Sequence, residues 1–231
     1  MSLTIVKGKT KVHINREDLL KAITPYERVV LDIGTGDGKY ILKSARTTPI
    51  TFFIGLDPSA QAMEESSKKI NRKTTRGGVT NAIFIVSGVE SLPHELDGVA
   101  EEIHINMPWG SLLKGLVLGE QIVLKNITRV AKPDAKLEIL INYSAFHGDR
   151  ISQDMSHLPS LTYEYIDSVL YDIYRNAGLV IVERKLVGKN DMITMNTVWA
   201  KKLAYGRESR MMRIRATINP DTDQTLPNVN L

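Results

Sequence analysis

Residues 28–38 read RVVLDIGTGDG, an apolar run that ends in the acid Asp32 and is followed by regularly spaced glycines. Glycine stands at every second position of the last five: Gly34, Gly36 and Gly38. This pattern is typical of a buried strand that turns sharply into a helix around a nucleotide, because glycine allows unusual backbone angles and has no Cβ to collide with a ligand. A second apolar run, residues 51–56, ends at Asp57, where an acid can bind ribose hydroxyls. The two segments predict a nucleoside site at the carboxyl edge of a parallel sheet.

The glycine spacing and the nearby acids indicate which nucleoside is bound. A dinucleotide fingerprint reads G-x-G-x-x-G and places a helix N-terminus against a pyrophosphate. Here the spacing is G-x-G-x-G, and Asp32 and Asp37 add negative charge at the same edge. A cationic nucleoside such as S-adenosylmethionine fits better, and we expect Asp32 near its amino-acid end. A dinucleotide-dependent dehydrogenase and a glycine-rich turn without a ligand are the alternatives.

The remaining sequence alternates predicted strands and helices, which indicates an α/β fold. A hairpin (3–6 and 12–15) and a short helix (16–24) come first. Further strands are expected at 28–33, 51–56, 82–86, 102–106, 136–141, 179–186 and 195–200, and helices at 39–45, 60–73, 120–130 and 163–176. The last two strands have no helix between them, so we expect an antiparallel hairpin at the edge of a mostly parallel seven-stranded sheet. We expect three segments: the N-terminal hairpin and short helix (1–26), the main domain (27–215) and a disordered tail (216–231).

Composition narrows the class of protein. The chain has 231 residues, of which 42% are hydrophobic, enough for one α/β core. It has no cysteine, which excludes disulfides and thiolate metal sites, and no H-x-x-x-H pattern suggests another metal centre. No apolar run approaches the roughly twenty residues of a membrane span. We expect a cytoplasmic monomer without a metal.

Basic residues gather in two segments although the net charge is only +4. The first contains Lys68, Lys69, Arg72, Lys73 and Arg76, spaced as one face of a helix. The second contains Lys201, Lys202, Arg207, Arg210, Arg213 and Arg215. Either cluster alone is most simply a solvated surface, but the pair beside a cofactor site predicts binding to nucleic acid.

The two tryptophans lie where they could hold a base. Trp109 follows the predicted fourth strand after Pro108, and Trp199 ends the predicted final strand. Large aromatic side chains usually pack in the core. In a protein that binds nucleic acid, two indoles at the sheet edge can instead stack on an unpaired base.

Several of these segments resemble the 16S ribosomal RNA adenine-N1 methyltransferases, the group that confers aminoglycoside resistance by modifying adenine 1408. The similar runs are DIGTGDG (32–38), IGLDP (54–58), ESLP (90–93), MPWGSLL (107–113) and TVWAKKLAYGR (197–207). The resemblance covers residues 1 to about 215, and implies a Rossmann-like class I methyltransferase fold acting on 16S rRNA of the 30S subunit.

The resemblance also implies roles for individual residues. S-adenosylmethionine is expected to contact Asp32, Gly34, Gly36, Asp57, Glu90, Ser111 and Thr197. The target adenine is expected between Trp109 and Trp199, with backbone contacts from Pro108. RNA is expected to contact Lys68, Lys69, Arg72, Lys73, Lys202 and Arg207. Two positions depart from the family: Met107 stands where phenylalanine is common, and Lys202 where arginine is common, without the bidentate fork of arginine.

Other functions stay open on the sequence alone. The segment 106–109 partly matches the N-P-P-aromatic loop of amino-group adenine methyltransferases, and a transfer RNA guanine-N7 methyltransferase has a related sheet and a proline-tryptophan loop. A small-molecule methyltransferase and a noncatalytic RNA-binding protein are further alternatives. His104, within a predicted strand, is interpreted as a structural histidine rather than a catalytic base or metal ligand.

Overall fold

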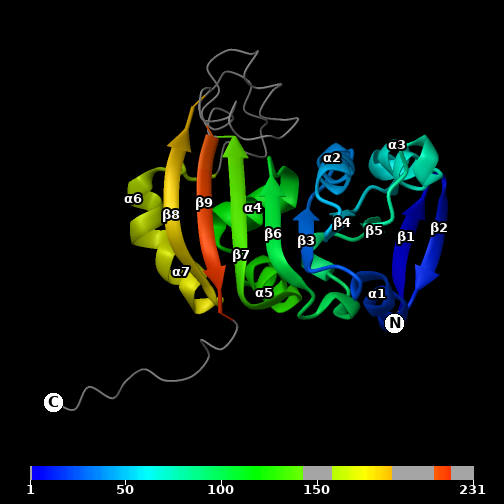
Figure 1. The fold of residues 1–231 in the computed structure, drawn as a ribbon. Coiled ribbons are helices and arrows are strands. Elements are labelled where there is room, and N and C mark those ends of the chain that lie inside the picture. The colour runs from blue at the N-terminus through cyan, green and yellow to red at the C-terminus, as the bar shows by residue number, and fades with distance from the viewer. Residues whose placement is uncertain (1, 143–157, 189–210, 220–231) are drawn as a thin grey trace.

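The computed structural model describes residues 2–142, 158–188 and 211–219. Within them lies one sheet of nine strands in the order β2-β1-β5-β4-β3-β6-β7-β9-β8 (Figure 1). The strands are β1 Leu3–Lys7, β2 Thr10–Ile14, β3 Arg28–Ile33, β4 Thr51–Asp57, β5 Ala82–Val86, β6 Ala100–Asn106, β7 Ala131–Asn142, β8 Leu179–Val187 and β9 Met211–Ile218. The main helices are α1 Arg16–Ile23, α2 Lys39–Thr47, α3 Ala60–Ile70, α4 Gly110–Leu118, α5 Gln121–Val130, α6 Tyr163–Tyr165 and α7 Tyr171–Asn176.

The centre of the sheet is parallel, as the sequence predicts. Strand β3 pairs in parallel with β4 on one side and with β6 on the other, and β5 and β7 continue the parallel order outward. Both faces of β3 and β4 are buried, which is why these strands read as continuous apolar runs rather than alternating ones. All the parallel strands therefore end at one edge of the sheet, and the glycine-rich turn after β3 lies there.

Helices cover the two faces of the sheet unequally. The larger core packs α1, α4, α5 and the 163–176 helical region against one face, and a smaller core packs α2 and α3 against the other. In Figure 1, α2 and α3 lie over the right half of the sheet. The front face of β6, β7, β9 and β8 carries no helix from the described part of the chain.

The antiparallel pair at the end of the chain is present, but it uses a different last strand. Strand β9 inserts between β7 and β8 and runs antiparallel to both. The predicted final strand, 195–200, lies outside the described residues. Because β9 continues to Ile218, the folded region extends past the expected domain end at residue 215.

The N-terminal residues belong to the same core as the main domain. Strand β1 pairs antiparallel with β5, so the predicted hairpin extends the sheet rather than standing apart from it. Leu3, Ile5 and Leu19 are buried in the larger core. The segment 1–26 is therefore structurally continuous with the main domain.

The predicted helices differ from the observed ones in three places. Helix α4 was not predicted. Helix α3 ends at Ile70 rather than at residue 73, and a short 3-10 turn, Thr74–Arg76, follows it. The helix expected over 163–176 is present, but five of its residues, Ile166–Leu170, form a π-helical segment.

Candidate active site

A cavity of ≈ 380 Å³ lies at the carboxyl edge of the parallel strands. It is at the point where the strand order reverses, with β4 on one side of β3 and β6 on the other, which is the usual ligand position in such sheets. Its lining includes eight of the predicted site residues: Asp32, Gly34, Gly36, Asp57, Glu90, Pro108, Trp109 and Ser111. The other two predicted for this site, Thr197 and Trp199, lie outside the described residues.

Asp32 provides a buried carboxyl group at the base of the cavity. Its side chain is 1% exposed, and Asn106 Nδ2 donates a hydrogen bond of 3.1 Å to its Oδ1. Burial raises the pKa of Asp32 to about 6, and the neighbouring Asp57 carboxylate adds to the shift, whereas Asn106 and the positive charge of His104 oppose it. Asp32 is therefore mostly ionised at pH 7 and attracts a cationic group into the cavity.

Two glycines of the 32–38 turn, Gly34 and Gly38, are required by both backbone angle and space. Gly34 has φ +75°, and a Cβ there would lie 2.8 Å from Leu112 Cδ2. Gly38 has φ +67°, and a Cβ there would lie 2.5 Å from Phe84 Cε1. A side chain at either position would strain the backbone and collide with Leu112 on α4 or Phe84 on β5, so the turn keeps this shape only with glycine there.

Asp57 is held at the tip of β4 by the same turn. Its Oδ2 accepts a hydrogen bond of 2.9 Å from the Gly36 N–H, and its Oδ1 accepts one of 2.8 Å from the Ser59 N–H. An ionised carboxylate has about four acceptor positions, so these two bonds orient Asp57 and leave acceptors for hydroxyl donors. The arrangement fits the ribose of a nucleoside.

Trp109 lies exposed at the rim of the cavity. Its side chain is 62% exposed, whereas Pro108 before it is buried, so Trp109 is not a core residue. Met107 holds a left-handed backbone angle of φ +56°, which is uncommon for a residue with a side chain. The Met107 N–H nonetheless donates to Leu140 O at 2.8 Å. This strained turn directs Trp109 outward at the start of α4, where a flat ring is available for stacking.

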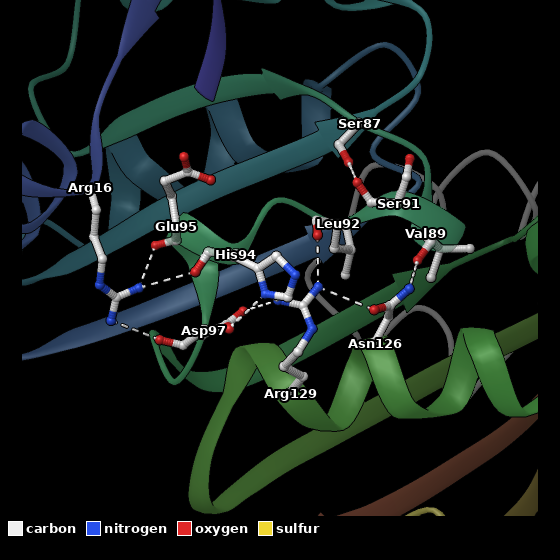
Figure 2. Close-up of polar contacts among 10 residues, drawn as sticks. All are labelled: Arg16, Ser87, Val89, Ser91, Leu92, His94, Glu95, Asp97, Asn126 and Arg129. Carbon is white, nitrogen blue, oxygen red and sulfur yellow. Dashed lines mark hydrogen bonds and ion pairs between the residues drawn. The ribbon is translucent and has the colours of Figure 1, made fainter. Parts of the chain in front are cut away.

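The opposite wall of the cavity is the connection from β5 to β6, which helix α5 holds in place (Figure 2). Arg129 donates from Nη2 to Leu92 O at 2.7 Å and to Asn126 Oδ1 at 3.1 Å, and its Nη1 pairs with Asp97. Asn126 Nδ2 in turn donates to Val89 O at 2.9 Å. The turn Val89–Ser91, which carries Glu90, is therefore fixed by two side chains of α5.

A second arginine holds the far end of the same connection. Arg16, at the start of α1, donates from Nη1 to Glu95 O at 2.7 Å and from Nη2 to Asp97 O at 2.9 Å (Figure 2). Neither arginine contacts the cavity. Both satisfy backbone carbonyls of a segment whose regular structure is two short 3-10 turns, Val89–Ser91 and His94–Leu96, and which would otherwise be free to move.

Comparisons with known proteins agree with this geometry. The family model described as "NpmA: 16S rRNA (adenine(1408)-N(1))-methyltransferase" matches residues 4–218. An Escherichia coli 16S rRNA (adenine(1408)-N(1))-methyltransferase is 34% identical over 94% of this chain and 99% of its own length. The chain belongs to this family.

Solved structures of family members have the same fold. A tryptophan-to-alanine mutant of the Catenulisporales acidiphilia enzyme, solved with its cosubstrate S-adenosylmethionine, has a TM-score of 0.88 at 34% identity and covers 96% of this chain and 100% of its own. The aminoglycoside resistance methyltransferase NpmB1 has a TM-score of 0.81 at 35% identity, covering 94% of this chain and 99% of its own. The predicted class I methyltransferase fold is thus confirmed.

The first basic cluster lies at the end of α3, where part of its charge is paired. Lys68 Nζ lies 2.7 Å from Glu64 Oε1, and Lys69 Nζ lies 3.3 Å from Glu65 Oε1. Arg72, Lys73 and Arg76 are exposed in the segment after the helix. The cluster therefore forms a helix end and a loop rather than the single helical stripe that the spacing predicts. The assigned RNA contacts Lys68, Lys69, Arg72 and Lys73 stay a prediction.

Of the second basic cluster, the structure describes Arg213 and Arg215. Arg213 and Arg215 lie within β9, where Arg213 Nη2 is 2.6 Å from Glu183 Oε1 and Arg215 Nε is 2.7 Å from Glu138 Oε2. These two arginines are paired with acids on neighbouring strands, and their contact with RNA stays a prediction. Lys202 and Arg207 lie outside the described residues.

Tyr40 on α2 and Asn106 at the end of β6 are among the lining residues that were not predicted from the sequence. The position of Asn106 at the end of a parallel strand was a usable signal, whereas Tyr40 carries none before the helix is placed. Among the described residues, no group of three potential metal ligands lies together, and no helix is long and apolar enough to cross a membrane.

Proposed function

We propose that this enzyme transfers a methyl group from S-adenosylmethionine to N1 of adenine 1408 in 16S rRNA. The observation that carries the proposal is the juxtaposition, in one cavity, of two oriented carboxylates and an exposed indole: Asp32, Asp57 and Trp109. The first two fit a cationic nucleoside, and the third fits a planar base at the mouth of the same cavity. Membership of the 16S rRNA (adenine(1408)-N(1))-methyltransferase family supports the reaction and its target.

The residues present fit the cofactor at both of its ends. Asp32 is placed to hold the ammonium of the amino-acid part, and Asp57 the ribose hydroxyls. Glu90, Ser111 and Thr197 complete the proposed set of contacts, with Gly34 and Gly36 leaving space for the nucleoside. When bound, S-adenosylmethionine supplies an electrophilic methyl group on its sulfonium.

Catalysis by the chain itself is mainly positioning. Adenine N1 has a free lone pair and is neutral at pH 7, so no side chain has to remove a proton before transfer. The enzyme must instead extrude the base and hold it rigidly, because near-attack geometry recovers much of the entropic part of the barrier. Trp109 and Trp199 are the proposed stacking faces, each contributing about 1 to 3 kcal/mol of base binding, with Pro108 fixing the loop.

The proposed substrate is the 30S subunit, recognised partly through the exposed charges after α3. Arg72 and Lys73, together with Lys68, Lys69, Lys202 and Arg207, are the proposed contacts to RNA phosphates. We place the protein in the cytoplasm as a monomer that needs no metal. Its product would confer resistance to aminoglycosides, the property for which the similar enzyme NpmB1 is named.

Primer extension tests this function. Purified enzyme and S-adenosylmethionine with a labelled methyl group are incubated with 30S subunits and, separately, with transfer RNA, and reverse transcription is then read across the target region of the 16S rRNA. An N1 methyl blocks the Watson–Crick edge, so we expect a strong stop at adenine 1408 that disappears when the cofactor is omitted. Read-through in the presence of incorporated methyl label would contradict N1 as the target, and label on transfer RNA alone would favour the guanine-N7 reaction.

A further inference from the structure

A row of alternating charge crosses the sheet from the cavity to its edge. The backbone pairings that define it are Asp32↔His104, His104↔Glu138, Glu138↔Arg215 and Glu183↔Arg215. Residues paired across adjacent strands point to the same face of the sheet. Acids and bases therefore alternate over β3, β6, β7, β9 and β8, and the first member of the row is the cavity carboxyl group of Asp32.

At the end of this row farthest from the cavity, the charged side chains form ion pairs. Arg215 lies between two acids, with Nε 2.7 Å from Glu138 Oε2 and Nη1 3.2 Å from Glu183 Oε2. His104 occupies the equivalent place between Asp32 and Glu138. It is the one member of the row with an ordinary pKa near neutral pH, so its charge decides whether the alternation is complete.

The surroundings of His104 favour its positive form. Three carboxyl groups face it: Asp32 from β3, Glu138 from β7 and Glu102 on its own strand, whose Oε1 lies 2.9 Å from His104 Nε2. The ring of Tyr40 on α2 covers it at a centroid distance of 5.5 Å and carries no charge.

The two arginines of this region are already engaged with acids: Arg28 Nη1 lies 3.3 Å from Glu102 Oε2, and Arg215 binds Glu138. Lys136 on β7 stands opposite Glu102 in the strand pairing. Burial lowers the pKa of His104, but the hydrogen bond to Glu102 and the three acids outweigh burial, so the pKa of His104 is raised above its ordinary value.

We propose that His104 is a positioning residue for the cofactor: its imidazolium keeps Asp32 ionised, so that Asp32 presents a full negative charge to the ammonium of S-adenosylmethionine. This inference rests on the proposed function, since it assigns a partner to a residue of the same site. It gives a functional role to His104, which the sequence alone indicated to be a structural histidine.

The effect has a defined pH dependence. With His104 charged, the pKa of Asp32 is about 6. Replacing the imidazolium with a neutral group raises the pKa of Asp32 by about one unit, so its ionised fraction at pH 6 falls from about one half to about one tenth. Binding through the ammonium then weakens about five-fold at pH 6. At pH 8.5 Asp32 is ionised with or without the imidazolium, and the difference falls to less than about 1.2-fold.

The test is calorimetric titration with S-adenosylhomocysteine, which keeps the amino-acid end and is stable over this pH range. Wild type, His104→Gln and the control His13→Gln are measured at pH 6, 7 and 8.5. Glutamine can still donate to Glu102, and His13 is an exposed histidine on β2. We expect the ratio of dissociation constants, His104→Gln over wild type, to fall from about five to about one as pH rises, with a flat ratio near one for His13→Gln. A pH-independent ratio for His104→Gln would overturn the inference.

A second measurement is decided on the wild-type protein, with one variant as support. Histidine titration by NMR on the wild-type protein should give His104 a pKa above 6.5, and Glu138→Gln should lower it. A value below 6.5 would overturn the inference while leaving the methyltransferase assignment intact. Failure of the wild-type protein to bind S-adenosylhomocysteine at every pH would instead refute the proposed function, and the inference with it.

Discussion

Replacing Arg129 with methionine should loosen the loop that carries Glu90. Methionine keeps most of the aliphatic volume but removes every donor of the guanidinium. The variant leaves the Leu92 carbonyl and the Asp97 carboxylate without this partner, and it frees Asn126, which holds Val89 in the cavity wall. Arg129 contacts no part of the cavity itself, so any effect on the cofactor must pass through the loop.

The expected cost follows from the three contacts. The Arg129 side chain is 24% exposed, and each hydrogen bond from a charged donor to a largely buried acceptor contributes about 1 to 2 kcal/mol. The Asp97 side chain is 38% exposed, which reduces its share to about 1 kcal/mol or less. The total is about 3 kcal/mol, or a fall of about 6 to 12 °C in Tm for a chain of this size. If about 1.4 kcal/mol of this appears as local opening of the loop, cofactor binding weakens about ten-fold.

Differential scanning calorimetry and calorimetric titration with S-adenosylmethionine measure the two effects. Lys125→Met is the matched control, because Lys125 lies exposed on the same helix, one turn earlier. We expect the control to change neither quantity measurably. A Tm for Arg129→Met within about 1 °C of wild type, or unchanged cofactor affinity despite a lower Tm, would show that the loop is held by other contacts.

Three further tests address the site, the fold and the substrate surface. Trp109→Ala should leave Tm and cofactor affinity near wild type, since the side chain is 62% exposed, and should slow methyl transfer to 30S subunits at least ten-fold; unchanged turnover would refute the stacking role. Gly38→Ala should lower stability by about 2 to 4 kcal/mol in urea denaturation, because its Cβ would lie 2.5 Å from Phe84, whereas Gly36→Ala, with nothing within 4 Å, should cost about 1 kcal/mol; equal losses would disprove the steric argument. Arg72→Ala with Lys73→Ala should reduce the slope of log affinity against log salt by about 1.5, and an unchanged slope would remove both residues from the RNA contacts.

Local sequence patterns were sufficient for the cavity. The strand Arg28–Ile33 and the strand Thr51–Asp57 are continuous apolar runs with acids and glycines at their carboxyl ends, and both the strands and the turn are where the sequence places them. These signals are local because a buried parallel strand has both faces covered and its ligand edge always follows its last residue.

Long-range packing accounts for the elements that were missed. Helix α4 contains Gly115, which weakens any helix prediction, yet a Cβ there would lie 2.5 Å from Val123 Cγ2 on α5. The segment of strand β9 was interpreted as part of a basic cluster because it contains Arg213 and Arg215. These arginines alternate with buried apolar residues. Their acidic partners come from β7 and β8, far away in the sequence, and no local pattern reveals that pairing.

Nucleoside analysis of the modified RNA tests the central claim most directly. 30S subunits are incubated with the enzyme and S-adenosylmethionine carrying a labelled methyl group. The 16S rRNA is then digested and its nucleosides are separated by liquid chromatography with mass spectrometry. We predict that the label is recovered as 1-methyladenosine, from a fragment that contains adenine 1408. Label recovered as N6-methyladenosine or 7-methylguanosine, or no label in 16S rRNA at all, would contradict the account.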